Sequence, residues 1–264
     1  MKKTICLLIC GDVVGKTGRE VVAKHLPLLR EEYKLDGIIV NGENAAAGFG
    51  ITQTIAHDFL KQGVDVITTG NHIWDQRDII HYIDTEPRLL RPVNWTKDAP
   101  GKGSVLFTTK RGHKIAVINV MGRVFMEALR DPFECLEQEI TKYENIADMI
   151  VVDFHGEAAS EKLAAAYYFD GRISALVGTH THIPTSDARI LPHGTAYQTD
   201  LGMCGDYHSI TGMTKETAIP RFLKKGPLPR LTVAEGSAEL WGCIITFDYE
   251  CKRTMSIKDR KSVV

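Results

Sequence analysis

Five apolar, strand-like runs of this 264-residue sequence each lead into residues that are able to bind a metal ion. The side chains at these junctions are carboxylates, carboxamides and imidazoles, without a thiolate. The candidate ligands are Asp12, Glu43, Asn44, Asn71, His155, His180 and His182. A mixed set of nitrogen and oxygen donors suits borderline ions such as Mn, Fe or Zn better than Cu(I) or an iron–sulfur cluster. We expect Fe or Mn, with Zn or Mg as further candidates.

The number and charge of these ligands indicate more than one ion. Seven donors exceed what a single tetrahedral zinc needs, and they suit two divalent or mixed-valence ions that share a carboxylate. Two divalent ions carry more positive charge than Asp12 and Glu43 neutralise, so the excess could hold a hydroxide and a phosphate. Two ions ~3.5–4 Å apart can generate hydroxide and clamp the attacking and leaving oxygens. The predicted chemistry is therefore phosphoester hydrolysis by metal-activated hydroxide.

Each junction also has a structural explanation when it is taken alone. Asp12 could cap a helix, Glu43 and Asn44 could belong to a polar loop, and His155 could be a buried, hydrogen-bonded histidine. The pair His180 and His182 is harder to explain this way, because alternate residues of an extended segment face the same side. The combination at five equivalent strand ends favours one shared site.

The elements that must position these residues alternate along the first two-thirds of the chain. Apolar runs that are typical of buried strands alternate with helical patterns, which indicates an α/β core. In an open α/β sheet the ligand site lies at the carboxyl ends of the strands. The spacing predicts helices over 19–35, 52–62, 76–83, 131–143 and 160–169. We expect Pro27 to kink or split the first helix, and Thr52 and Ser160 to cap the second and the last.

The last third of the chain has a different character. After His182 the sequence predicts short strands and turns, and it ends in two antiparallel strands over 239–249 and 252–257. A hairpin is expected from strands over 104–109 and 114–120. The later strands suggest a second sheet beside the first. Without a convincing linker, residues 1–264 are expected to form a single domain.

Composition and charge give little reason to expect a membrane protein or a secreted one, and they leave nucleic acid open as a substrate. The formal net charge of −1 provides no global attraction to nucleic acid or to a membrane. The six cysteines form no CxxC pair, which is typical of free thiols in a reducing compartment. The apolar start is short and lacks a cleavage pattern, and no run approaches the ~20 apolar residues of a transmembrane helix. We therefore expect a cytoplasmic protein without a membrane partner.

A competing motif overlaps the first junction. The segment Gly11–Thr17 follows an apolar run and is close to a phosphate-binding P-loop, and Asp153 could end a Walker B strand. A P-loop needs four residues between its first glycine and Gly-Lys, whereas three stand here. A P-loop nucleoside triphosphatase is therefore the weaker alternative, because the spacing fails and the histidines stay unexplained.

Several blocks of the sequence resemble calcineurin-like metallophosphoesterases. These blocks are Gly11-Asp12, Gly70-Asn71-His72 and Gly178–His182. Two departures are informative: Val14 stands where that superfamily has a histidine, and Asn41–Asn44 replaces its usual Gly-Asp block. Both departures resemble the YmdB-like branch, as do Asp153–Lys162 and Asp200–Gly205. The resemblance spans nearly the whole chain and implies a two-sheet α/β/β/α sandwich.

The resemblance also implies roles for the candidate residues. It implies one ion on Asp12, Glu43, Asn44 and His182. It implies a second ion on Glu43, Asn71, His155 and His180, with Glu43 bridging. Asn44 would take the place of the missing histidine. His72 would be the general acid for the leaving oxygen, because its ordinary pKa of ~6.5 is close to working pH. The alternative for His72 is that it orients the site.

The implied substrate is a small-molecule phosphodiester. The resemblance implies hydrolysis of 2′,3′-cyclic nucleotides at the 2′ P–O bond, which leaves a 3′-nucleotide; RNA ends and a homo-oligomer stay open. A regulatory nucleotide-binding metalloprotein with little turnover is the second hypothesis. Phe49 and Trp74 could stack on a base or pack in the core. Arg123 could approach a phosphate or form a surface salt bridge.

Overall fold

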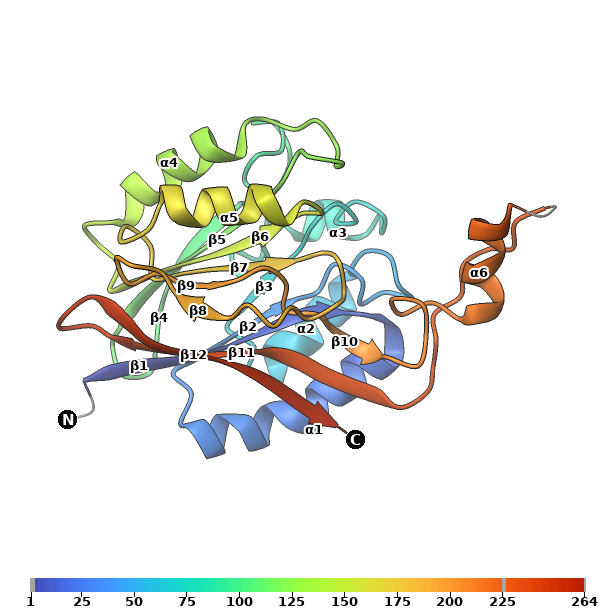
Figure 1. Cartoon of the computed structure of the whole chain (residues 1–264), viewed down its shortest axis with the longest axis horizontal. Helices are drawn as coiled ribbons and strands as arrows, with labels where there is room; N and C mark the ends of the chain where they lie inside the picture. Colours follow the sequence, from blue (N-terminus) through green and yellow to red (C-terminus); the bar gives the residue numbers. More distant parts are fainter. Residues whose placement is uncertain (1–2, 225–226, 264) are drawn as a thin grey trace.

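The computed structural model describes residues 3–224 and 227–263, and within them two mixed six-stranded sheets lie face to face (Figure 1). The first sheet has the order β12 (Arg253–Val263), β11 (Ala238–Asp248), β10 (Met203–Asp206), β1 (Thr4–Val13), β2 (Gly37–Asn41) and β3 (Val66–Thr68). The second has the order β4 (Ser104–Thr108), β5 (Lys114–Met121), β6 (Met149–His155), β7 (Ala175–Thr179), β9 (Ala196–Gln198) and β8 (Arg189–Ile190).

Helices cover the outer faces of both sheets. The helices are α1 (Gly15–Tyr33), α2 (Gln53–Lys61), α3 (Ile79–Tyr82), α4 (Pro132–Tyr143), α5 (Ala159–Tyr168) and α6 (Lys215–Leu223). In Figure 1, α1 and α2 lie against the first sheet and α4 and α5 against the second, while α6 projects to one side. One buried apolar cluster fills each helix–sheet boundary and a third fills the space between the sheets. The predicted α/β/β/α sandwich is confirmed.

Strand β1 shows how the sequence produces these layers. Its side chains alternate, so that Ile5, Leu7 and Ile9 face the second sheet while Cys6 and Leu8 face the helices. All of these side chains are at most 4% exposed. A strand that is buried on both faces appears in the sequence as one continuous apolar run, which is the pattern of residues 5–10.

The carboxyl ends of the parallel strands meet at one edge of the molecule. β1, β2 and β3 run parallel to one another, as do β5, β6, β7 and β9. β1 changes its pairing near its end: up to Cys10 it pairs antiparallel with β11, and at Asp12 it pairs parallel with β10. A side chain at Gly11 would overlap the carbonyl of Gly202. Glycine therefore permits the close contact that places Asp12 inside the strand.

The predicted helices exist, but their ends differ in places. Thr52 caps α2 by accepting a hydrogen bond from the Ile55 amide, as predicted. α1 begins at Gly15, earlier than predicted, and Pro27 does not split it. Buried residues on both sides of the exposed Pro27 ring hold that helix to the sheet. The predicted Ser160 cap is wrong, because α5 begins after Ala158, which makes no side-chain capping bond.

The last third of the chain departs most from the sequence pattern. α6 was not predicted, because Pro220 lies inside it and only Ala218 of the helix is buried, which leaves little amphipathic signal. β12 extends to Val263, past the expected end at residue 257. None of the helices in the described ranges has the length and apolar character needed to cross a membrane. The cysteines are free thiols, as predicted.

Candidate metal centre

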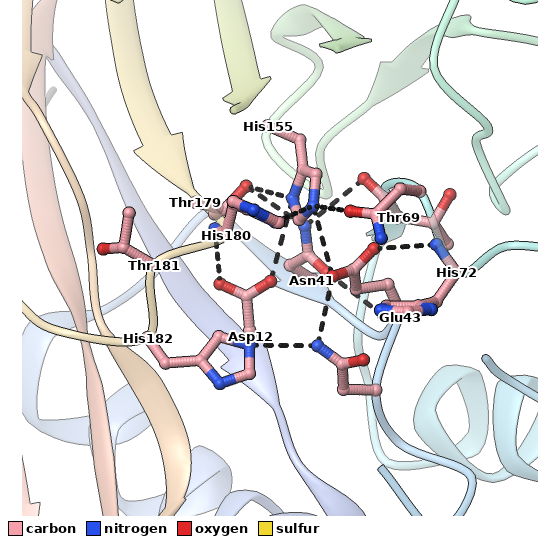
Figure 2. Close-up of polar contacts among 12 residues, drawn as sticks. Asp12, Asn41, Glu43, Thr69, His72, His155, Thr179, His180, Thr181 and His182 are labelled. Atoms are coloured by element: carbon pink, nitrogen blue, oxygen red, sulfur yellow. Dashed lines mark hydrogen bonds and ion pairs between the residues drawn. The ribbon is translucent and has the colours of Figure 1, made fainter. Parts of the chain in front are cut away.

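The structure brings all seven candidate ligands together at the carboxyl edge of the two sheets. Figure 2 labels Asp12, Glu43, His155, His180 and His182 among them. Asp12 belongs to β1, and His155 is the last residue of β6. The remaining candidates follow directly after β2, β3 and β7, in the order Glu43, Asn44, Asn71, His180 and His182. Side chains from two different sheets therefore face one buried centre.

The first group of donors surrounds Nε2 of His155. Glu43 Oε1 lies 3.2 Å from this nitrogen, Asn71 Oδ1 lies 3.0 Å from it, and His180 Nδ1 lies 3.1 Å from it. The other ring nitrogen of His155 is 2.9 Å from the Thr179 hydroxyl, which fixes the orientation of the ring. Glu43, His155 and His180 can together hold one ion.

The second group shares Glu43 with the first. Asp12, Glu43 and His182 also place one ligand atom each within reach of a common ion. Nδ1 of His182 is 2.8 Å from the Thr211 carbonyl, which leaves Nε2 for the centre. The Asn44 amide nitrogen lies 3.1 Å from Glu43 Oε1 and 3.0 Å from His182 Nε2. Glu43 is thus the side chain on which both groups depend.

The charges of these buried groups are strongly coupled. Burial raises the pKa of Asp12 to about 7. Burial would also raise the pKa of Glu43, but the charge and hydrogen bond of His155, together with the charges of His72 and His180, outweigh it and hold that pKa at about 2. In return the charge and hydrogen bond of Glu43, together with the charges of Asp12 and Asp153, outweigh the burial of His155 and raise its pKa to about 9. Burial and the neighbouring His155 lower the pKa of His180 to about 3. A cation at this position would replace the proton that Glu43 and His155 share.

Two further observations show that a cation fits this centre. Asp12 Oδ1 is fully buried and, among the described residues, has no hydrogen-bond partner; a buried carboxylate oxygen of this kind is costly unless a cation satisfies it. Beside it, a side chain at Gly70 would overlap His155 Nε2 and Glu43 Oε2. Glycine at this position therefore keeps open the space on which the donors converge.

The loop that carries His180 and His182 is strained rather than extended, so the expectation of an extended segment was wrong. His180 has a φ of 107° and His182 a φ of 65°, in a region that non-glycine residues rarely occupy. Such backbone strain persists where surrounding contacts hold it, often at functional sites. Here the His180 amide donates to Asp12 Oδ2 at 3.0 Å, and the Thr181 amide donates to Asp200 Oδ2 at 3.0 Å. The strained loop directs the two imidazoles into different donor groups.

A buried ion pair that was not identified from the sequence contacts the backbone of this loop. Lys162 Nζ lies 3.0 Å from Asp200 Oδ2, and both side chains are 0% exposed. The same ammonium donates to the Thr179 carbonyl at 2.9 Å. The pair therefore fixes both ends of the turn that precedes His182. The sequence contained a signal for this pair, because Lys162 stands three and four residues before Ala165 and Ala166, on what proves to be the buried face of α5. A lysine at such a position needs a buried partner.

Asp153 does not reach the centre, so its interpretation as a Walker B residue was wrong. It is buried below the ligands and accepts hydrogen bonds from Thr68 at 2.5 Å, from Thr179 at 2.7 Å and from Asn41 at 3.1 Å. The P-loop interpretation also fails at the first junction. Only Val14 stands between β1 and α1, so there is no loop long enough to surround a phosphate.

His72 and Phe49 lie at the open side of the centre. Both line a pocket of about 210 Å³ that also contains Glu43, His180 and His182. His72 Nδ1 is 2.8 Å from Asp75 Oδ2, so the imidazole is held at that nitrogen and Nε2 is left for a ligand. The Phe49 ring packs edge-on against His72 at 5.1 Å.

The two remaining candidates have structural roles. Trp74 packs against Trp95, with ring centroids 6.0 Å apart, beside the core of the first sheet. Arg123 forms an ion pair of 2.5 Å with Asp131. Of the aromatic residues considered for base stacking, only Phe49 lines the pocket beside the donor groups.

Two solved structures are similar to this chain over nearly its whole length. A hypothetical protein from Thermus thermophilus superposes with a TM-score of 0.90 at 40% identity, covering 98% of this chain and 99% of the other. A protein from Mycoplasma pneumoniae, described as a novel phosphatase, superposes with a TM-score of 0.92 at 33% identity, covering 100% of this chain and 95% of the other. Together with the two packed sheets, these matches support the predicted calcineurin-like metallophosphoesterase fold.

Sequence comparison agrees with the structural matches. A Bacillus subtilis (strain 168) protein named 2′,3′-cyclic-nucleotide 2′-phosphodiesterase is 47% identical over 252 residues, which is 96% of this chain and 95% of the relative. The family model described as YmdB-like protein matches residues 8–259. Because that match includes every donor of both groups, and the relatives cover nearly the whole chain, this protein belongs to the YmdB-like family.

Proposed function

We propose that this protein is a metal-dependent phosphodiesterase that hydrolyses 2′,3′-cyclic nucleotides to 3′-nucleotides at a two-ion centre. The observation that carries the proposal is that Glu43 belongs to both donor groups. One of these groups also contains Asp12, whose buried Oδ1 has no hydrogen-bond partner among the described residues. The substrate class rests on the name of the Bacillus subtilis relative. The alternative, a regulatory nucleotide-binding metalloprotein with little turnover, would use the same donors.

In this proposal each of the two donor groups described above would hold one ion, and Glu43 would belong to both. Asp12, Glu43, Asn44 and His182 would hold one ion. Glu43, Asn71, His155 and His180 would hold the other. To serve as a ligand, Asn44 would turn its amide so that Oδ1 replaces Nδ2 toward the centre. The nitrogen and oxygen donors favour Fe or Mn. When bound, two such ions would lower the pKa of a water molecule and neutralise phosphate charge.

The surrounding side chains would orient the substrate and manage its protons. Phe49, Met213 and Leu231 form an apolar side of the pocket, where a nucleobase can pack. His72 faces the same space, and its hydrogen bond to Asp75 fixes the ring. In this arrangement His72 Nε2 would carry the proton for the departing 2′ oxygen, while burial of the donor groups excludes bulk water.

Replacing His72 with Asn tests its role as general acid. We expect kcat for adenosine 2′,3′-cyclic phosphate to fall by about 10²–10⁴-fold, because the 2′ alkoxide would leave without a proton. The loss should be much smaller for bis(p-nitrophenyl) phosphate, whose leaving group needs no proton. Metal content should stay that of the wild type. An equal loss on both substrates would instead assign His72 to orienting the site.

Metal analysis paired with a panel of cyclic and linear phosphodiesters tests the function itself. We expect bound metal in the purified protein, loss of hydrolysis after chelation, and its return when Mn²⁺ or Fe²⁺ is added. Chromatography should identify 3′-AMP, rather than 2′-AMP, as the product from adenosine 2′,3′-cyclic phosphate. Full turnover by chelated protein would contradict the proposal. Tight nucleotide binding without product would favour the regulatory alternative.

A further inference from the structure

A second cavity adjoins the pocket at the metal centre. It has a volume of about 400 Å³ and is lined by Lys16, Arg19, Ala47, Arg230, Leu231, Thr232, Val233 and Glu235. Leu231 lines both cavities. One loop borders both as well, because its Ala47 lines the second cavity while the next two residues, Gly48 and Phe49, line the first. A ligand that extends past Leu231 would therefore enter both spaces.

This second cavity is positively charged, although the whole chain carries a net charge of −1. Lys16, Arg19 and Arg230 contribute three positive charges to its lining, against one negative charge from Glu235. The Lys16 ammonium lies 3.7 Å from Glu20, and both side chains are more than 60% exposed, so this pair holds it weakly. Arg230 is exposed and, within the described residues, forms no ion pair. Two cationic groups are thus available to an anionic ligand.

The walls of the cavity are fixed relative to the metal centre. The Gly15 amide donates to the Asn44 carbonyl at 2.9 Å, and the Arg19 guanidinium donates to the Ala45 carbonyl. On the opposite side Val233 packs so closely that a side chain would lie 2.5 Å from it at Gly15 and 2.7 Å from it at Gly48. The segment Gly15-Lys16-Thr17, which is not a P-loop, therefore places its lysine beside the loop that carries Asn44.

We propose that this cavity binds a phosphoryl group on the 5′ oxygen of the nucleotide whose 2′,3′-cyclic phosphate lies at the metal centre. The inference rests on the proposed function and names its substrate more closely. In such a nucleotide the reacting phosphate bridges O2′ and O3′ on one edge of the ribose, and O5′ projects from the other. With the base against Phe49 and Leu231, the 5′-phosphate would extend past Leu231 into the cavity that Lys16 and Arg230 line. Both 5′-phosphorylated mononucleotides and RNA ends carry this group.

Equilibrium binding tests the inference without turnover. Adenosine 3′,5′-bisphosphate should bind the metal-loaded wild type about tenfold more tightly than adenosine 3′-monophosphate, as expected for charge-assisted hydrogen bonds. Lys16→Ala and Arg230→Ala should each reduce that ratio, and the double variant should bring it close to one. Lys24→Ala, on an exposed part of the same helix, should keep the wild-type ratio. Equal affinities in the wild type, or a ratio unchanged in the double variant, would overturn the inference.

Turnover then identifies the source of the 5′-phosphate. We expect kcat/KM to be higher for adenosine 2′,3′-cyclic phosphate that carries a 5′-phosphate, for the dinucleotide ApA with a terminal 2′,3′-cyclic phosphate, or for both, than for the parent nucleotide. A preference for the dinucleotide would assign RNA ends, and a preference for the mononucleotide would assign free nucleotides. Lys24→Ala, outside the cavity, should leave kcat/KM for the parent nucleotide unchanged. If no cyclic nucleotide is hydrolysed, the proposed function fails, and the binding ratio still decides the inference.

Discussion

The Glu43→Gln variant is expected to lose hydrolysis of 2′,3′-cyclic nucleotides and to keep its fold. Glu43 is the carboxylate that both donor groups share, and its pKa of about 2 keeps it ionised at neutral pH. A neutral amide removes one of the two negative charges among the seven donors. Metal-ion stabilisation is worth several kcal/mol, and each ~1.4 kcal/mol is tenfold in rate, so kcat/KM should fall by more than about 10³-fold.

Two measurements separate loss of the centre from loss of the fold. Metal content should fall in Glu43→Gln, whereas the circular dichroism spectrum of the chelated variant should match that of the chelated wild type. Glu216→Gln, which alters an exposed carboxylate on α6, should match the wild type in activity and metal content. His180→Ala removes a ligand from one group only, and it too should abolish hydrolysis. If both Glu43→Gln and His180→Ala retain turnover, the two-ion mechanism is wrong.

The Lys162→Met variant is expected to have the largest effect on stability. Lys162 and Asp200 are fully buried, and removing one partner leaves an uncompensated charge in the core. Breaking such a pair costs roughly 3–5 kcal/mol in the free energy of unfolding. The Thr179 carbonyl would also lose the hydrogen bond that it accepts from the ammonium. Denaturant-induced unfolding of the chelated protein measures this cost without a contribution from bound metal.

A second substitution and a surface control make this prediction specific. Asp200→Leu in the Lys162→Met background removes the uncompensated charge, so the double variant should recover part of the lost stability. It should not recover activity, because Asp200 also accepts from the Thr181 amide in the strained histidine loop. The control Lys142→Met breaks a partly exposed pair with Glu139 and should cost at most about 1 kcal/mol. A cost for Lys162→Met no larger than that of the control would contradict the prediction.

Local sequence patterns were sufficient to predict secondary structure where buried residues recur at a regular spacing. The apolar run 5–10 predicted a buried strand, and the Asp131-Pro132 pair predicted the start of α4, where Asp131 accepts from the Phe133 and Glu134 amides. These patterns failed where the local conformation depends on contacts with residues that are distant in the sequence, or where an element has little buried surface. The exposed helix α6 has almost no buried face to produce a pattern. The positive φ values of His180 and His182 depend on carboxylates that are supplied by β1 and by residue 200.

The sequence by itself determined the chemistry that this protein can offer. Carboxylate, carboxamide and imidazole at the ends of apolar runs predicted a metal centre, because side-chain type and strand-end position are local properties. The blocks around Asn41–Asn44 and Gly178–His182 were specific enough to indicate the family that comparison then confirmed.

Only the tertiary structure decided how these residues are arranged and what surrounds them. The distances that join Glu43 to both donor groups depend on how the two sheets pack, and that packing is set by apolar contacts between strands far apart in the chain. The same packing buries Lys162 against Asp200 and brings Lys16 and Arg230 to one cavity beside the centre. No spacing along the chain encodes these contacts, because they arise only when the sheets close on each other.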